Sequence, residues 1–189
     1  GGGIADGAQG PDISAIPSIA LKKVEVLRDG AAAQYGSDAI AGILNFVYKD
    51  AAEGYRLEIK SGEYKEGDGQ TVRIGMNAGM PFTDDGYANF SLELQETDPT
   101  ARSEQRGDAA SLKAAGVPVW AHPFGNGEAQ VWGSPKVKDD VKFVGNIGLE
   151  LTPSSKFYLF GNYAEKNVMG GFFFRNPNNR TGVYDDGSD

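Results

Sequence analysis

Alternation of apolar and polar residues is the feature that most constrains this chain. It recurs in five segments of seven to eleven residues: 55–61, 70–80, 87–96, 141–151 and 156–166. In segment 55–61 the sequence reads YRLEIKS, so three apolar side chains alternate with three charged ones. A period of two places successive side chains on opposite faces of a β-strand. The alternation therefore predicts a mainly β protein whose strands approach the length that crosses a bilayer when tilted.

The opposite face of these strands is polar and includes charges such as Arg73 and Glu93. The fifth segment is aromatic on both faces, so its register stays open. Strands that are apolar on one face also occur in soluble β-sandwiches and lipocalin-like barrels. Taken alone, the alternation favours a soluble β domain.

The connections between the segments differ strongly in length. Links 81–86 (PFTDDG) and 152–155 (TPSS) consist of turn residues, whereas the link from Thr97 to Asp139 exceeds 40 residues. Residues 108–115 within that long link predict a short helix. Short turns at one end and long loops at the other are typical of outer-membrane β-barrels.

Composition excludes several functions. The net charge of −8 argues against a nucleic-acid partner, and the absence of cysteine excludes disulfides and thiolate metal sites. His122 is the only histidine, which excludes a histidine-rich metal site. Acidic pairs at 84–85, 139–140 and 185–186 lie in turn-like sequence, so we expect solvated carboxylates. We predict no catalytic residue, metal site or cofactor, and no apolar run is long enough for a transmembrane helix.

Residues 16–49 have a different texture from the alternating segments. Pro17 and Ser18 predict the start of a short helix, and 24–28 predicts a half-buried strand. Asp29-Gly30 predicts a turn, and 31–34 a second short helix. The apolar run 43–48 (ILNFVY) predicts a strand covered on both faces.

The run 23–49 (KVEVLRDGAAAQYGSDAIAGILNFVYK) closely resembles the end of the plug domain of TonB-dependent outer-membrane receptors. The positions that agree with the family pattern are Lys23, Val24, Glu25, Val26, Leu27, Arg28, Tyr35, Gly36, Ser37, Ala39, Ile40, Gly42, Asn45 and Lys49. Asp29-Gly30 and Ala41 depart from it. A match of this length reverses the preference for a soluble domain.

The resemblance implies a partial antiparallel transmembrane β-barrel of about five strands, preceded by part of an α+β plug domain. Residues 1–50 correspond to the C-terminal part of the plug, and 51–189 to the first strands and loops of the barrel. Five strands in lipid leave unpaired backbone groups at two edges, each costing several kcal/mol. The chain is therefore expected to be a fragment of a closed barrel of about 22 strands.

The resemblance also implies ligand-gated active transport of a scarce nutrient across the outer membrane of a Gram-negative bacterium. Siderophore-iron, cobalamin and carbohydrate are the ligand classes that we consider, and no covalent chemistry is expected, so the protein is not predicted to be an enzyme. The implied partners are outer-membrane lipid, a small ligand such as a metal chelate or glycan, and the TonB–ExbB–ExbD complex through a segment upstream of Gly1.

Two alternatives remain open at this point. One is a ligand-binding or signalling receptor with little transport. The other is a secreted, soluble β-sandwich carbohydrate-active protein, which would need two carboxylates converging at about 5–9.5 Å in a cleft.

In the family, charged residues of this motif bond to opposite charges on the inner barrel wall and hold the plug. By that resemblance, Glu25 and Arg28 are the predicted plug–barrel lock. Asp6 and Gln9, in the glycine-rich stretch 1–10, fall where the family's apical loop contacts ligand.

The long loop supplies the remaining candidates. Trp120, His122 and Trp132 lie among Gly and Pro, and such side chains suit stacking on a sugar, an aromatic chelator or a corrin-like ligand. The alternative is that they pack the loop onto itself or onto the barrel rim.

Overall fold

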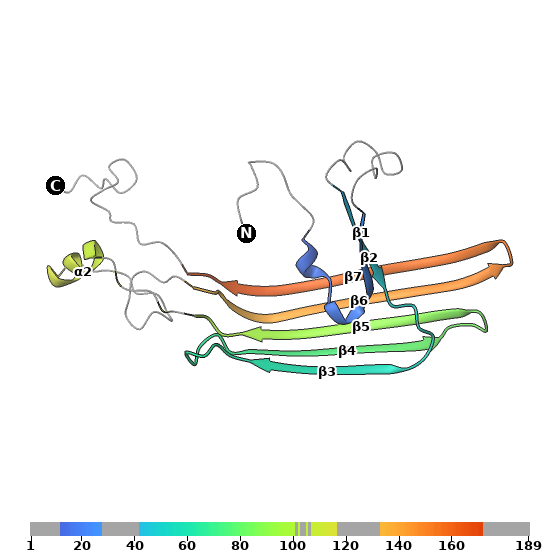
Figure 1. Cartoon of the computed structure of the whole chain (residues 1–189), viewed down its shortest axis with the longest axis horizontal. Coiled ribbons are helices and arrows are strands. Elements are labelled where there is room, and N and C mark those ends of the chain that lie inside the picture. The colour runs from blue at the N-terminus through green and yellow to red at the C-terminus, as the bar shows by residue number, and fades with distance from the viewer. Residues whose placement is uncertain are drawn as a thin grey trace. The chain divides into compact units, whose positions relative to one another are not determined.

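The computed structural model describes residues 12–27, 42–100, 102, 105, 107–116 and 133–171, and these are mostly β-strand (Figure 1). Two short 3₁₀ helices, η1 (Ile13–Ala15) and η2 (Ser18–Ala20), precede the first strand. The strands are β1 (Leu21–Leu27), β2 (Ile43–Tyr48), β3 (Tyr55–Gly62), β4 (Thr71–Pro81), β5 (Gly86–Thr97), β6 (Lys136–Thr152) and β7 (Ser155–Met169). The α-helix α2 (Gly107–Ala114) confirms the helix predicted within the long link.

The strands form two sheets. β1 and β2 pair with each other in antiparallel register, and the other five follow one another in the order β3-β4-β5-β6-β7 (Figure 1). All five alternating segments are strands, which confirms the mainly β prediction with antiparallel sheets. In the part of the chain that the structure describes, β3 and β7 end the larger sheet and no closed barrel is present.

β6 begins at Lys136, five residues before the predicted start at 141. Asp139 lies within it at a φ of 52°, in the left-handed region. The adjacent acids Asp139 and Asp140 interrupt the alternation and resemble turn sequence, although the strand continues through them. The start of this strand was therefore invisible to a period-two pattern.

In the larger sheet, large apolar side chains are exposed and polar side chains are buried, which is the reverse of the arrangement in a soluble domain. Large apolar side chains of one face are exposed, including Tyr55 at 91%, Ile59, Met76 and Met80. The buried polar and charged residues are Asn77, Asn89, Ser91, Glu93, Thr100, Asp140 and Asn146. Since charged residues are almost never fully buried unless they are paired, the buried face requires specific partners.

The η2 segment supplies part of that cover. Pro17, Ile19 and Ala20 are buried, and Ile19 packs on Gly75 of β4. A Cβ at Gly75 would lie 3.0 Å from Ile19 Cδ1, which is tighter than ordinary contact. Glycine at this position therefore allows the η2 segment to approach the sheet backbone closely.

Three local predictions within 16–49 need correction. The strand expected at 24–28 corresponds to part of β1, but its apolar residues Val24 and Val26 are exposed, so it has no buried apolar face. The first helix begins at Ser18 rather than Pro17 and is a single 3₁₀ turn, with Pro17 as its N-cap. β2 has the predicted bounds, but none of its residues is buried and Leu44 is 56% exposed. The prediction that β2 is covered on both faces is therefore wrong for the described residues. The predicted helix at 31–34 lies outside the described residues.

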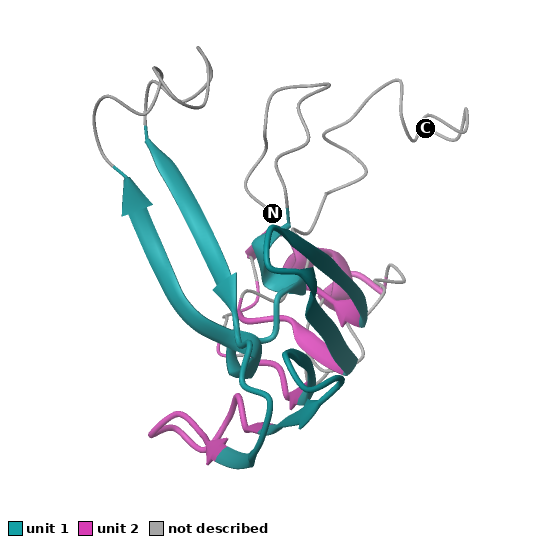
Figure 2. Ribbon diagram, turned by 90° about the vertical axis from the view of Figure 1, so that its right-hand side faces the viewer, with its two compact units in different colours: residues 1–60, 73–95, 139–166 teal, residues 61–72, 96–138, 167–189 magenta. Residues whose placement is uncertain are grey.

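By its contacts the chain divides into two compact units (Figure 2). Unit 1 comprises residues 1–60, 73–95 and 139–166, and unit 2 comprises 61–72, 96–138 and 167–189. None of the described helices is long and apolar enough to span a membrane.

Candidate functional site

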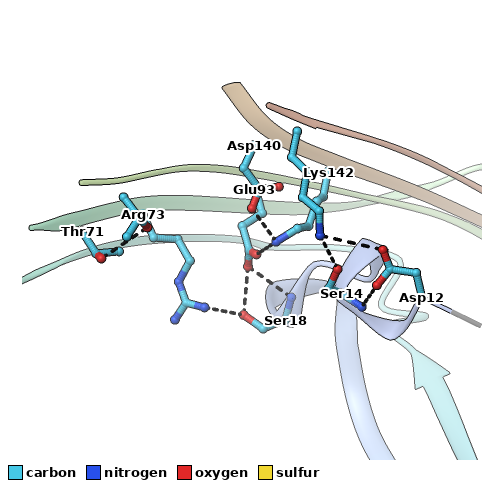
Figure 3. A network of polar contacts seen from close by, with 10 residues as sticks. Asp12, Ser14, Ser18, Thr71, Arg73, Glu93, Asp140 and Lys142 are labelled. Carbon is cyan, nitrogen blue, oxygen red and sulfur yellow. Dashed lines mark hydrogen bonds and ion pairs between the residues drawn. The ribbon is translucent and has the colours of Figure 1, made fainter. Parts of the chain in front are cut away.

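A charged cluster in unit 1 surrounds Ser18 at the start of η2 (Figure 3). The Ser18 backbone N–H and Oγ both donate to Glu93 Oε2, at 3.1 and 2.9 Å, and Arg73 Nη1 donates to Ser18 Oγ at 3.4 Å. The first N–H groups of a helix lack partners within it, and Pro17 offers no side-chain cap. Glu93, from β5, therefore caps η2 across a separation of 75 residues.

Glu93 is also paired within the sheet. Its Oε1 lies 3.2 Å from Lys142 Nζ, and Lys142 Nζ lies 3.3 Å from Asp140 Oδ2. These three side chains are only 4–11% exposed, so each charge needs the others. We refer to Ser18, Arg73, Glu93, Asp140 and Lys142 as the Ser18 cluster.

Charge in this cluster comes entirely from the sheet. Glu93 and Asp140 are balanced by Arg73 and Lys142, all on β4, β5 or β6. Ser18 contributes only neutral groups. The finding also corrects the prediction of solvated carboxylates at 139–140, because Asp140 is buried and paired with Lys142.

A second, more exposed contact joins η1 to β7. Lys166 Nζ donates to Ser14 Oγ at 2.8 Å and lies 3.8 Å from Asp12 Oδ2. Asp12 Oδ1 accepts from the Ser14 N–H at 2.9 Å, and hydrogen bonding to Ser14 lowers the pKa of Asp12. Asp12, Ser14, Asp140, Lys142 and Lys166 line a pocket of about 140 Å³, which is large enough to hold water.

Three asparagines hold the backbone that leads from β2 into β3, and we call them the asparagine cluster. Asn146 Nδ2 donates to Lys49 O at 2.8 Å, and Asn89 Nδ2 donates to Ala51 O at 3.1 Å. Asn77 Nδ2 donates to Asn89 Oδ1 at 2.6 Å and so orients that amide. The bonds of Asn89 and Asn146 attach the connecting backbone to β5 and β6, and Asn77 of β4 supports Asn89.

The same connection passes very close to β4. A Cβ at Gly79 would lie 2.3 Å from Ala51 O, a separation that real side chains do not tolerate. The Gly79 N–H donates to Gly54 O at 2.9 Å. Glycine is therefore required at 79 for the connection to cross the strand.

Of the predicted site residues, Glu25 is the one that the structure describes. It lies opposite Asn45 in the β1–β2 register, accepts from Asn45 Nδ2 at 2.8 Å, and pairs with Lys23 Nζ at 2.5 Å. Hydrogen bonds to Lys23 and to Asn45 lower the pKa of Glu25, and the bond to Lys23 has the larger effect. Both contacts lie within the hairpin, so the predicted bond from Glu25 to the barrel wall stays a prediction.

The other predicted site residues fall outside the described part of the chain. They are Arg28, Asp6, Gln9, Trp120, His122 and Trp132. Conversely, no sequence pattern indicates Ser18, Asp140 or Lys142 as site residues. Glu93 and Lys142 were visible as charges on the polar face of their strands, but nothing local indicated that η2 would meet them.

Unit 2 has an ionic cluster of its own, around Arg102. Arg102 Nε pairs with Asp68 Oδ2 at 2.7 Å, Nη1 pairs with Glu66 Oε2 at 3.2 Å, and the guanidinium lies 5.4 Å from the centre of the Tyr64 ring. These contacts tie the β3–β4 link to the start of the long link. Among the described residues, no group of three or more His, Cys, Asp or Glu side chains is arranged to hold a metal ion.

Comparison with known proteins supports the motif analysis. Residues 3–43 match the family described as TonB-dependent Receptor Plug Domain. Over 94 residues the chain is 30% identical to the vitamin B12 transporter BtuB of Photobacterium profundum, covering 49% of this chain and 15% of that relative. No solved structure matches the chain significantly. The resemblance to the TonB-dependent receptor plug is thus confirmed, and the chain spans only a small part of the relative's length.

Proposed function

We propose that this chain is the plug-to-barrel region of a TonB-dependent outer-membrane transporter that imports a scarce nutrient. Residues 1–50 would be the C-terminal part of the plug, and 51–189 the first strands and loops of the barrel. The observation that carries this proposal is the η2 segment bound to the buried polar face of a sheet whose other face exposes large apolar side chains.

The polarity of the sheet has a simple physical explanation in that setting. Exposed side chains such as Tyr55, Leu57 and Met76 would contact lipid hydrocarbon, and the polar face would line a lumen filled by the plug. β6 and β7 have 17 and 15 residues, more than the roughly 9–11 that cross a bilayer. Their additional residues would extend beyond the hydrocarbon layer.

Transport in this proposal involves no covalent chemistry. The TonB–ExbB–ExbD complex would pull on a plug segment upstream of Gly1, and contacts such as those of Ser18 would separate to open a path. Glu25 and Arg28 remain proposed lock residues toward the barrel wall. Asp6, Gln9, Trp120, His122 and Trp132 remain proposed ligand contacts.

The substrate class is proposed only as a metal chelate, a cobalamin or a glycan. The relative that matches is named a vitamin B12 transporter, which makes cobalamin the first compound to test. Siderophore-iron complexes and oligosaccharides form the rest of the panel.

The test uses the full-length gene in a Gram-negative host that lacks its own cobalamin receptor. Outer membranes would be examined for heat-modifiable electrophoretic mobility, and cells for uptake of radiolabelled cobalamin and ferric chelates with and without TonB. We expect a heat-dependent shift and TonB-dependent accumulation of one compound. A soluble, unshifted protein would refute the proposal, and binding without accumulation would favour the signalling alternative.

A further inference from the structure

The Ser18 hydroxyl separates two opposite charges of the sheet. It donates to Glu93 Oε2 at 2.9 Å and accepts from Arg73 Nη1 at 3.4 Å (Figure 3). Because both atoms contact the same oxygen, the sum of these two distances is the most that can separate them. An ion pair needs an N···O separation of about 4 Å or less, so a small movement of the flexible arginine side chain would join the two residues directly.

Departure of Ser18 would leave one oxygen of Glu93 without its donors. Oε1 would keep Lys142, which itself keeps Asp140, but Oε2 would lose both the N–H and the hydroxyl of Ser18. A buried carboxylate oxygen without a donor is costly. Among the described residues Arg73 has no ion pair, and its guanidinium already contacts the Ser18 hydroxyl that binds Glu93 Oε2, so it could take the place of Ser18.

We propose that Arg73 closes onto Glu93 Oε2 when the η2 segment leaves the sheet, and that this ion pair stabilises the released state. The inference rests on the proposed function, because it supposes that the η2 segment leaves during transport. Ser18 and Arg73 then compete for the same carboxylate oxygen. In the bound state Ser18 supplies the donors to Glu93 Oε2, and in the released state Arg73 supplies them, so Glu93 keeps a partner at both oxygens when the plug segment leaves.

Ile19 provides a reporter for release. Its side chain projects from η2 onto Gly75 of β4 and is only 4% exposed, and the 189 residues contain no cysteine. In the full-length protein, the rate at which a soluble maleimide labels Ile19→Cys measures how often this segment opens. The assay uses purified protein in detergent and needs no ligand and no TonB.

Arg73→Gln gives the decisive comparison. If Arg73 stabilises the released state, Arg73→Gln should slow labelling by about two- to fivefold, as expected for an ion pair at a partly exposed site. A residue that merely holds Ser18 in place would have the opposite effect, because its removal would speed labelling. Arg73→Lys, which keeps the charge, should label at close to the rate of the parent.

Two further variants test the roles of Glu93 and Ser18. In a Glu93→Gln background, Arg73→Gln should no longer change the labelling rate. Ser18→Ala should speed labelling, and by a smaller factor when Arg73 is Gln. Faster or unchanged labelling of Arg73→Gln, or slowing that persists without the Glu93 charge, would overturn the inference.

Failure of the proposed function would look different from failure of this inference. Loss of the heat-modifiable shift or of TonB-dependent uptake in the parent protein would refute transport. A wrong sign for Arg73→Gln in a parent that shifts and imports would refute only the ion pair.

Discussion

A disulfide between η2 and β4 should stop transport reversibly. Ile19 Cβ lies 3.4 Å from the position of a Cβ at Gly75, close to the roughly 3.5–4.5 Å between the Cβ atoms of bonded cysteines. Ile19→Cys also removes Cδ1, the atom that a Cβ at Gly75 would meet at 3.0 Å. The pair Ile19→Cys/Gly75→Cys should therefore oxidise with little movement of the backbone.

The size of the effect follows from the loop that the bond closes. The bond would close the loop between positions 19 and 75. Chain entropy predicts about 4 kcal/mol of stabilisation for such a loop, a value between those for loops of about 15 and about 100 residues. The stabilisation applies to unfolding and also opposes release of η2 from the sheet, because the segment cannot leave while the bond holds. We expect TonB-dependent uptake to fall to background in the oxidised protein, while ligand binding at the cell surface is retained.

The assay is uptake by the full-length double variant before and after dithiothreitol, with disulfide formation followed by electrophoretic mobility. Ile19→Cys alone and the reduced double variant are the controls, and both should import, because neither holds η2 to β4 by a covalent bond. Full uptake by protein that is fully oxidised would show that η2 stays on β4 during transport, and our reasoning about the Ser18 cluster would then be wrong.

Two other predictions concern the β2–β3 connection and the β1–β2 strand pair. Gly79→Ala should destabilise the full-length protein by about 1–3 kcal/mol, because the new methyl group would meet Ala51 O at 2.3 Å, and should lower the temperature of the heat-modifiable transition. Gly161→Ala, where a Cβ meets nothing within 4 Å, is the matched control and should leave that temperature nearly unchanged. Because folding lowers the pKa of Glu25 below its ordinary value of 4.5, its contribution to stability is present above that value and lost as the pH falls through the folded pKa. Lys23→Gln should move the Glu25 pKa back toward 4.5 in an NMR titration, and an unmoved pKa would contradict the assigned cause.

Much of the secondary structure was predictable because its causes are local. Alternation and turn residues depend on neighbours in the chain, and they located every end of β3, β4 and β5 to within one residue. The start of β6 was missed because Asp139-Asp140 resembles turn sequence, whereas the strand continues through this pair. The exposure of Leu44 in β2 was missed because an apolar run does not state what covers it.

The sequence by itself determined the strand pattern and the family resemblance, since both reside in residue order. Only the tertiary structure decided which charges meet. Ser18 and Glu93 are 75 residues apart, and Asn146 reaches a backbone carbonyl 97 residues away. Such contacts depend on how η2 and the β2–β3 connection lie on the sheet, and neither alternation nor motif spacing contains that information. The physical reason is that burial, which makes Glu93 and Asp140 depend on Lys142, is a property of the assembled fold rather than of any local segment.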